Sequence, residues 1–185
     1  MKKRKPHFKM RGSSMIETLV SLLLLSFGSL GVAGLQATSK QTSHEAQQRL
    51  LASYLAQDVI ERMRNNPSVL ATYAGSAVGG SSISTEPSPN CSTSAPCTAA
   101  QLAAHDRWVW EQAIDGAAAR IGSMKTAGLV APKGCISNSN GRVQVVIAWN
   151  DVEVVADAGN ATGGVSTCGT ASGFRRQVVI NTFIS

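Results

Sequence analysis

The distribution of hydrophobic and polar positions divides the first 66 residues into two helical segments. Residues 19–35 carry no charge and are rich in leucine, and a stretch of this length and composition predicts a helix that can cross a membrane. From residue 36 to Asn66 the pattern is amphipathic, because apolar residues recur mostly at steps of three and four between charged and amide residues. The positions expected to be buried on this second segment are Leu51, Tyr54, Leu55, Val59 and Met63.

The two segments are predicted to form one continuous helix, with residues 13–37 as its apolar part and 38–66 as its amphipathic part. Glycines are the only strong helix breakers before the sequence Asn65-Asn66-Pro67, which ends the helix. The glycines at positions 28, 31 and 34 each weaken a helix by roughly 0.5–1 kcal/mol relative to alanine. They fit close packing between helices through small residues, and they also fit a soft point where the helix stretches.

The remaining residues, 67–185, predict a small globular domain that contains a second helix. Residues 75–98 are rich in Gly, Ser, Thr and Pro and are expected to form a loop. Thr98 is a good N-cap for a helix that runs to about residue 118. The expected buried face of this helix consists of Leu102, Val109, Trp110 and Ile114.

Three residues of this second helix, His105, Asp106 and Trp108, are of types that occur in active sites. No nucleophile with an oriented base accompanies them in the sequence. We therefore interpret the helix as part of the core.

The C-terminal third predicts a small antiparallel sheet. Strands at 134–137 and 143–149 flank Asn140-Gly141, a strong signal for a hairpin turn. A weaker strand is expected at 151–156 and a loop at 159–173. A final strand at 175–184 is expected to lie at an edge of the sheet. The predicted fold class is therefore α+β, with a long N-terminal helix packed on a small antiparallel sheet and an extra helix.

The positive charge of the chain is concentrated at its N-terminus. The formal net charge is +6, but six of the 17 basic residues precede Gly12, and the 11 that remain equal the 11 acidic residues in number. The basic segment 1–12 is therefore interpreted as a targeting leader that stays on the cytoplasmic side of a membrane. Since the other basic residues form no dense patch, direct nucleic-acid binding is not expected.

Four cysteines lie beyond the apolar segment, at Cys91, Cys97, Cys135 and Cys168. An even number of cysteines in a segment placed across a membrane indicates two disulfides in an oxidising compartment. Of the three possible connectivities, we favour the most local one, Cys91–Cys97 with Cys135–Cys168. A zinc site is disfavoured because no closely spaced C-x-x-C pair is present, and no metal or cofactor is expected.

One carboxylate, Glu17, stands at the start of the apolar segment. A charge costs roughly 2–3 kcal/mol near the middle of a membrane and less at its edge, so a functional role is the default hypothesis. The alternatives are a glutamate that sits at the lipid headgroups and a plain anchor that is not cleaved.

The sequence Gly12-Ser13-Ser14-Met15-Ile16-Glu17, followed by a long apolar helix, resembles the signal of type IV prepilins and pseudopilins. The resemblance implies that a prepilin peptidase cuts between Gly12 and Ser13 and methylates the new N-terminus at Ser13. The family more often has Phe-Thr-Leu where this chain has Ser13, Ser14 and Met15. A carboxylate at Glu17 would offset the buried ammonium of Ser13, since an unpaired buried charge costs several kcal/mol.

Three further segments look like the PilV-type minor pilins: residues 57–67, 145–151 and 174–178. This resemblance implies a non-enzymatic protein that helps initiate type IV pilus assembly and is incorporated at or near the pilus tip. The implied partners are the prepilin peptidase, other minor pilins, the major pilin, the pilus assembly platform and the inner membrane. The implied location is the inner membrane, with the C-terminal domain in the periplasm, and then the pilus fibre at the cell surface.

Two other functions remain open from the sequence. The first is a minor pseudopilin of a type II secretion system. The second is a membrane-anchored periplasmic binding protein or enzyme, although the residues beyond Asn66 contain no evident catalytic or metal-binding grouping.

Overall fold

The structure, a computed structural model, describes residues 14–92, 96–117, 120–121, 124–125 and 128–185. The chain divides into two compact units, Met1–His44 and Glu45–Ser185. In chain order the elements are α1 (Met15–Arg64), η1 (Pro67–Val69), α2 (Leu70–Tyr73), α3 (Ala99–Ile114), β1 (Arg120–Ile121), β2 (Met124–Lys125), β3 (Lys133–Ser139), β4 (Arg142–Asn150), η2 (Ala158–Asn160) and β5 (Arg175–Phe183).

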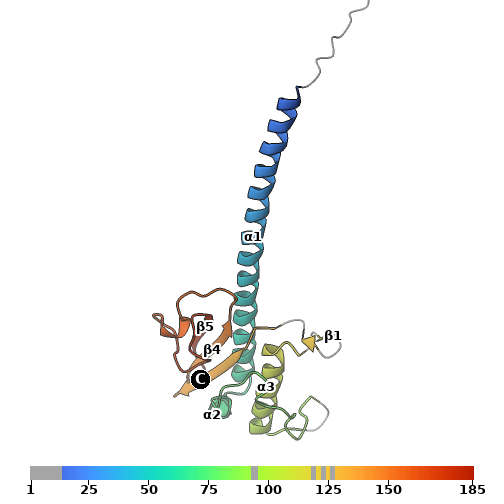
Figure 1. Cartoon of the computed structure of the whole chain (residues 1–185). Coiled ribbons are helices and arrows are strands. Elements are labelled where there is room, and N and C mark those ends of the chain that lie inside the picture. The colour runs from blue at the N-terminus through green and yellow to red at the C-terminus, as the bar shows by residue number, and fades with distance from the viewer. Residues whose placement is uncertain (1–13, 93–95, 118–119, 122–123, 126–127) are drawn as a thin grey trace, which may run out of the picture. The chain divides into compact units, whose positions relative to one another are not determined.

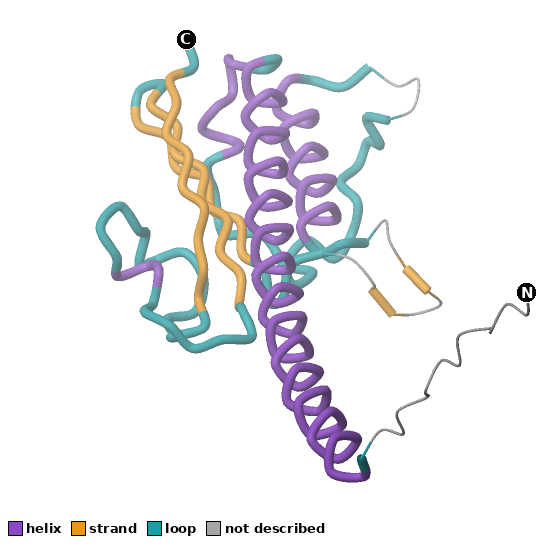
Figure 2. Tube along the Cα trace, turned by 90° about the horizontal axis from the view of Figure 1, so that it is seen from above, coloured by secondary structure: helices purple, strands orange, loops and turns teal. Residues whose placement is uncertain are grey.

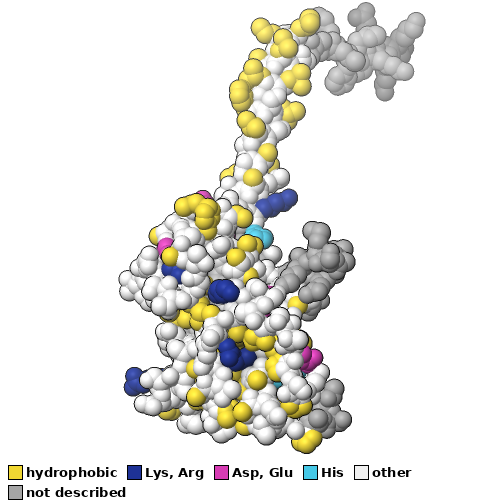
Figure 3. Space-filling model, turned by 60° about the horizontal axis from the view of Figure 1, so that its bottom comes forward, with side chains coloured by type: hydrophobic (Ala, Val, Ile, Leu, Met, Phe, Trp, Pro, Cys, Tyr) yellow, Lys and Arg dark blue, Asp and Glu magenta, His cyan; other side chains and the backbone are white. Residues whose placement is uncertain are grey.

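The described part of the first unit consists of the apolar beginning of α1. All of its described side chains are exposed, and hydrophobic side chains are visible along it in Figure 3. By length and composition, this helix can cross a membrane. Because these side chains are exposed, the apolar surface of residues 15–44 has no protein partner within the described chain.

In the second unit, the end of α1 contributes one face to the main hydrophobic core. The indole nitrogens of two buried tryptophans bind this part of the helix: Trp110 Nε1 donates to Leu55 O at 2.9 Å and Trp149 Nε1 donates to Gln48 Oε1 at 3.1 Å. The helix ends at Arg64, two residues before the predicted end and directly before the predicted stop Asn65-Asn66-Pro67, and Pro67 begins η1. The core-facing residues of α1 are Ala52, Leu55, Ala56, Val59, Ile60 and Met63.

A three-stranded antiparallel sheet in the order β3-β4-β5 lies beside the end of α1 in the second unit (Figures 1 and 2). The β3–β4 turn is the predicted Asn140-Gly141, and both residues have positive φ, +50° and +81°, as a two-residue hairpin of type I′ requires. A separate two-stranded sheet pairs β1 with β2. The core-facing residues of the main sheet include Ile136, Val143, Val145, Ile147 and Trp149. The predicted α+β fold class is thereby confirmed.

Helix α3 begins with the predicted cap. The side chain of Thr98 accepts from Gln101 N while the Gln101 side chain accepts from Thr98 N, which is a complete capping box. The helix ends at Ile114, four residues before the predicted end. Gly116, at φ +67°, donates to Ala113 O, and Ala117 N donates to Gln112 O, so a Schellman motif ends the helix here.

Three other sequence predictions were wrong in detail. Residues 151–156 form no strand. Two backbone hydrogen bonds hold them, from Asp151 N to Phe174 O at 2.9 Å and from Val155 N to Gly173 O at 3.0 Å, and Arg176 pairs with Asp151 at 3.3 Å and donates to Glu153 O. Tyr54 is 67% exposed, since the buried face of α1 is centred on the row through Ala52, Ala56, Val59 and Met63. Leu102 lies near the start of α3 and is 37% exposed.

Candidate functional site

Glu17 lies in the first turn of α1. Its backbone N–H donates to Ser14 O at 2.9 Å, and its side chain is in the exposed part of the helix. A carboxylate at this position interacts favourably with the positive end of the helix dipole. The predicted cleavage and methylation positions, Gly12 and Ser13, lie outside the described residues, as does the leader 1–12.

The glycines of the apolar segment leave part of the α1 surface open. An added Cβ at Gly28, Gly31 or Gly34 would meet nothing within 4 Å, and the helix is continuous through all three. A shallow groove in the surface of the first unit is lined by small and apolar residues: Leu24, Leu25, Gly28, Ser29, Val32, Ala33 and Gln36. Another helix could approach the backbone closely at this groove.

Two buried carboxylates, one on α3 and one at its C-cap, bind the loop that follows α2. Glu111 is fully buried and accepts hydrogen bonds from the backbone N–H of Gly79 and Ile83 at 2.8 and 2.7 Å, and from Ser82 through both its N–H and its hydroxyl. Asp115, 6% exposed, accepts from Gly80 N and Ser81 N, both at 2.8 Å. The two carboxylates therefore fix the loop to α3.

These bonds determine the ionisation of Glu111. Burial by itself raises the pKa of Glu111, but the hydrogen bonds from Ser82, Gly79 and Ile83 outweigh it and lower the pKa below its usual value. The carboxylate is thus charged at neutral pH and acts as an acceptor for all four donors. The backbone N–H groups of this loop form an anion-binding nest, and the anion that they bind is the Glu111 carboxylate of the protein itself.

Asp106, one of the residues with a possible catalytic role, joins three helices. It accepts from Arg62 at 3.0 Å and from the Tyr73 hydroxyl at 2.5 Å, and Arg62 also binds Asp58, four residues earlier on α1, at 3.0 Å. Burial, together with the bond to Asp106, raises the pKa of Tyr73, so its hydroxyl stays protonated and donates. This cluster connects the end of α1 with α2 and α3, as expected of core residues.

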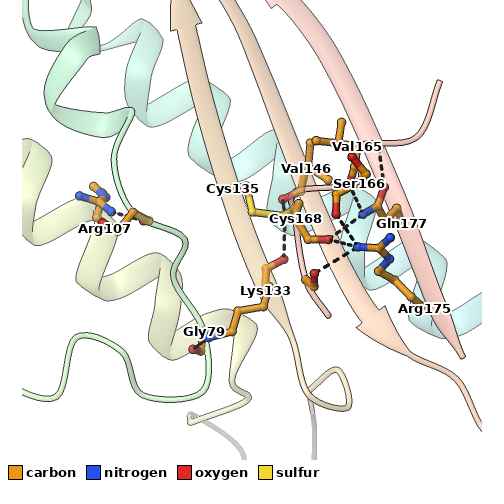
Figure 4. Close-up of a disulfide and its surroundings, with 12 residues drawn as sticks. Gly79, Arg107, Lys133, Cys135, Val146, Val165, Ser166, Cys168, Arg175 and Gln177 are labelled. Carbon is orange, nitrogen blue, oxygen red and sulfur yellow. Dashed lines mark hydrogen bonds between the residues drawn. A yellow bond between two sulfur atoms is a disulfide. The ribbon is translucent and has the colours of Figure 1, made fainter. Parts of the chain in front are cut away.

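Arg175, at the start of β5, holds the long loop between β4 and β5 (Figure 4). Its side chain is 1% exposed and binds Asp157 bidentately, at 2.6 Å from Nε and 2.9 Å from Nη2. Nη1 donates to three carbonyl oxygens, those of Ser166, Cys168 and Gly169, at 2.9–3.1 Å. The bonds from Arg175 lower the pKa of Asp157.

Close packing at Gly159 allows this arrangement. An ideal Cβ on Gly159 would lie 2.0 Å from Arg175 Nη2, so a larger residue would displace the guanidinium. The Arg175 cluster and the Glu111–Asp115 pair were not predicted from the sequence as sites. The burial of Glu111 could have been predicted, since this acidic residue directly follows Trp110, which lies on the predicted buried face of the helix.

Two disulfides are present, Cys91–Cys97 within the loop before α3 and Cys135–Cys168. These are the pairs that the sequence analysis favoured. The second bond attaches the β4–β5 loop to β3 on the outer face of the sheet, where Cys168 packs with Val146 and Ala148 (Figure 4). Among the described residues, no group of three or more His, Cys, Asp or Glu side chains is placed to hold a metal ion.

Part of the chain is similar to a known protein family. Residues 34–108, less than half of the chain, match the family model "Tt1218-like: Type IV pilin Tt1218". No curated protein and no solved structure matches the chain. The matched segment runs from the end of the apolar stretch through the amphipathic part of α1 and into α3, and type IV pilins are structural, non-enzymatic proteins. The long N-terminal helix packed on a three-stranded antiparallel sheet agrees with this match, so this part of the chain is similar to the Tt1218-like type IV pilins.

Proposed function

We propose that the protein is a minor pilin of the PilV type, which helps initiate type IV pilus assembly and is incorporated at or near the pilus tip. The observation that carries this proposal is the N-terminal part of α1, an exposed apolar helix with a single carboxylate, Glu17, in its first turn. The family match supports a pilin. The segments 57–67, 145–151 and 174–178, which resemble PilV-type proteins, support the minor role.

In this proposal the prepilin peptidase removes the leader after Gly12 and leaves a new N-terminus at Ser13, which is methylated. The mature helix lies in the inner membrane with the second unit in the periplasm, an oxidising compartment that suits the two disulfides. The assembly platform then transfers the helix into the fibre core beside the major pilin and the other minor pilins. Lipid and neighbouring helices are similarly apolar, so hydrophobic burial does not fix the position of this helix relative to its neighbours in the fibre. Polar contacts and close packing must fix that position.

The N-terminus of the protein isolated from its membrane tests the processing step. Intact-mass and N-terminal peptide mass spectrometry should show a chain that starts at Ser13, with one methyl group on its amine. A variant with Gly12→Leu should keep the leader and serves as the control. A wild-type chain that still starts at Met1 would contradict the proposal and favour an uncleaved membrane anchor.

Substitution of the carboxylate tests the pairing role. In the assembled fibre, the ammonium of Ser13 needs a nearby negative charge, because an uncompensated buried charge costs several kcal/mol. Glu17→Ala should therefore leave membrane insertion unchanged and reduce recovery in sheared pili about tenfold or more. Immunoblots of membrane and pilus fractions measure both quantities, with Glu45→Ala on the same helix as a matched control. Wild-type recovery of Glu17→Ala in pili would refute the pairing.

A further inference from the structure

We propose that the free edge of β5 binds an extended strand contributed by a different pilin subunit, so that the three-stranded sheet is completed to four strands in the assembly. This inference rests on the proposed function, since it takes the partner from the same pilus complex. It is carried by the backbone geometry of β5, by the side chains along it, and by the direction of α1.

The open hydrogen-bonding positions of β5 follow from its pairing with β4. Asp151 N donates to Phe174 O just beyond one end of the ladder, and Ile184 N donates to Gly141 O at the other, both at 2.9 Å. Both contacts continue the register of the ladder, in which Val145 pairs with Ile180. Phe174 and Ile184 are both even-numbered, and hydrogen-bonded pairs alternate with non-bonded pairs along antiparallel strands. The even-numbered residues of β5 therefore form the backbone hydrogen bonds to β4. The odd-numbered residues 177, 179, 181 and 183 direct their N–H and C=O groups outward.

This outward row has no partner within the described part of the chain. No described residue outside β4 makes a backbone hydrogen bond to residues 177–183. The opposite edge of the sheet differs, because Gly134 of β3 exchanges two backbone hydrogen bonds with Val78, at 2.8 and 2.9 Å, and Lys133 Nζ donates to Gly79 O. The loop held by Glu111 and Asp115 thus covers the start of β3, whereas β5 remains open.

The side chains along the open edge do not protect it from pairing. Natural edge strands are usually short, bulged, or interrupted by proline or charged residues. Residues 177–183, Gln-Val-Val-Ile-Asn-Thr-Phe, contain no charge and no proline, and the register with β4 is unbroken. Val178 and Ile180 pack against the core but remain only partly buried. A fourth strand with apolar residues on its core side would cover them.

A row of alternating N–H and C=O groups is satisfied by an extended polypeptide, which is the chemistry of β-strand addition. A second copy of this chain could pair its own β5 antiparallel about Ile180, with Val179 opposite Asn181 and Gln177 opposite Phe183. The two-fold axis of such a pair is perpendicular to the sheet and would make the two copies of residues 45–64 of α1 run in opposite directions. Subunits drawn from one membrane into one fibre run in the same direction, so the strand comes from another pilin in the complex.

Asn181→Pro tests the edge directly. It removes one outward N–H and places a ring at the edge, without removing a hydrogen bond to β4. Recovery of the full-length variant in sheared pili should fall about tenfold, the effect of roughly one lost backbone hydrogen bond. Asn181→Ala is the matched control, because it loses the Gln144–Asn181 side-chain bond of 3.0 Å and keeps the N–H. The control should be recovered like the wild type.

Amide hydrogen exchange of the wild-type chain provides a readout that does not depend on how the proline variant folds. In detergent, the amides at 177, 179, 181 and 183 should exchange fast while their even-numbered neighbours are protected. In sheared pili, the odd-numbered amides should become protected as well. Equal exchange in the two states, or wild-type recovery of Asn181→Pro, would overturn the proposal.

The same measurements separate this inference from the proposed function. If the wild-type chain is absent from sheared pili, the pilin role itself fails. If it is present and the odd-numbered amides stay open, the pilin role stands and the edge proposal fails. Protection that appears in the purified chain alone and rises with its concentration would identify a second copy as the partner, which also overturns the proposal.

Discussion

Arg175→Met is expected to lower the melting temperature of the full-length protein in detergent by about 10 °C, measured by near-UV circular dichroism. The guanidinium is 1% exposed and donates to three backbone carbonyls that the methionine cannot satisfy. Buried acceptors without a donor cost about 1–3 kcal/mol each, so the total loss should be about 3–5 kcal/mol after relaxation of the loop. The disulfide Cys135–Cys168 should remain intact, because the loop is still attached to β3.

Two further variants test whether the guanidinium geometry is the cause. Arg175→Lys keeps the positive charge but has no planar fork, and should therefore lie between wild type and Arg175→Met. Arg142→Met, on the exposed start of β4, should change the melting temperature little. Equal stability of Arg175→Met and wild type would mean that solvent replaces the arginine and that the β4–β5 loop does not depend on it.

Glu111→Gln is expected to destabilise the protein at neutral pH by about 2–4 kcal/mol, since an amide nitrogen would then face backbone N–H donors and the charged acceptor would be lost. The size of this loss should depend on pH. Because the folded protein lowers the pKa of Glu111, its stabilising contribution is full above the pKa of the unfolded chain and is lost as the pH falls through the folded value.

The expected result is a difference between two pH profiles. Between about pH 6 and pH 3, the melting temperature of the wild type should fall more than that of Glu111→Gln, so that the two curves approach each other at acid pH. Glu61→Gln, whose side chain is 70% exposed, should keep the wild-type profile. Parallel curves for wild type and Glu111→Gln would show that the negative charge of Glu111 does not contribute to the stability of the fold.

Both clusters serve the same purpose in different loops. Glu111 and Asp115 attach the loop after α2 to α3, while Arg175 and the Cys135–Cys168 bond attach the β4–β5 loop to the sheet. In each case a few buried polar side chains satisfy backbone groups that would otherwise be left without partners. Long connections in a small domain become ordered in this way, and neither loop pairs with the edge of β5 among the described residues.

The sequence by itself determined the elements that depend on local order. The uncharged stretch 19–35, the stop at Asn65-Asn66-Pro67, the Thr98 cap and the Asn140-Gly141 turn each follow from residues close together in the chain, and the structure contains all of them. The apolar start of the chain with its single carboxylate was also evident from the sequence, and the resemblance to type IV prepilins rests on residues 12–17 and the helix that follows.

Only the tertiary structure decided which groups meet over long distances. Residues 151–156 have the composition of a strand, yet they form a loop with three exposed valines, held by the Arg176 side chain and by two backbone hydrogen bonds to residues 173 and 174. Arg175 and Glu111 are ordinary charged residues in the sequence, and their roles arise because buried backbone groups from distant loops need partners. The open edge of β5 likewise depends on which strands pair, a non-local outcome that local propensity and hydrophobic period do not encode.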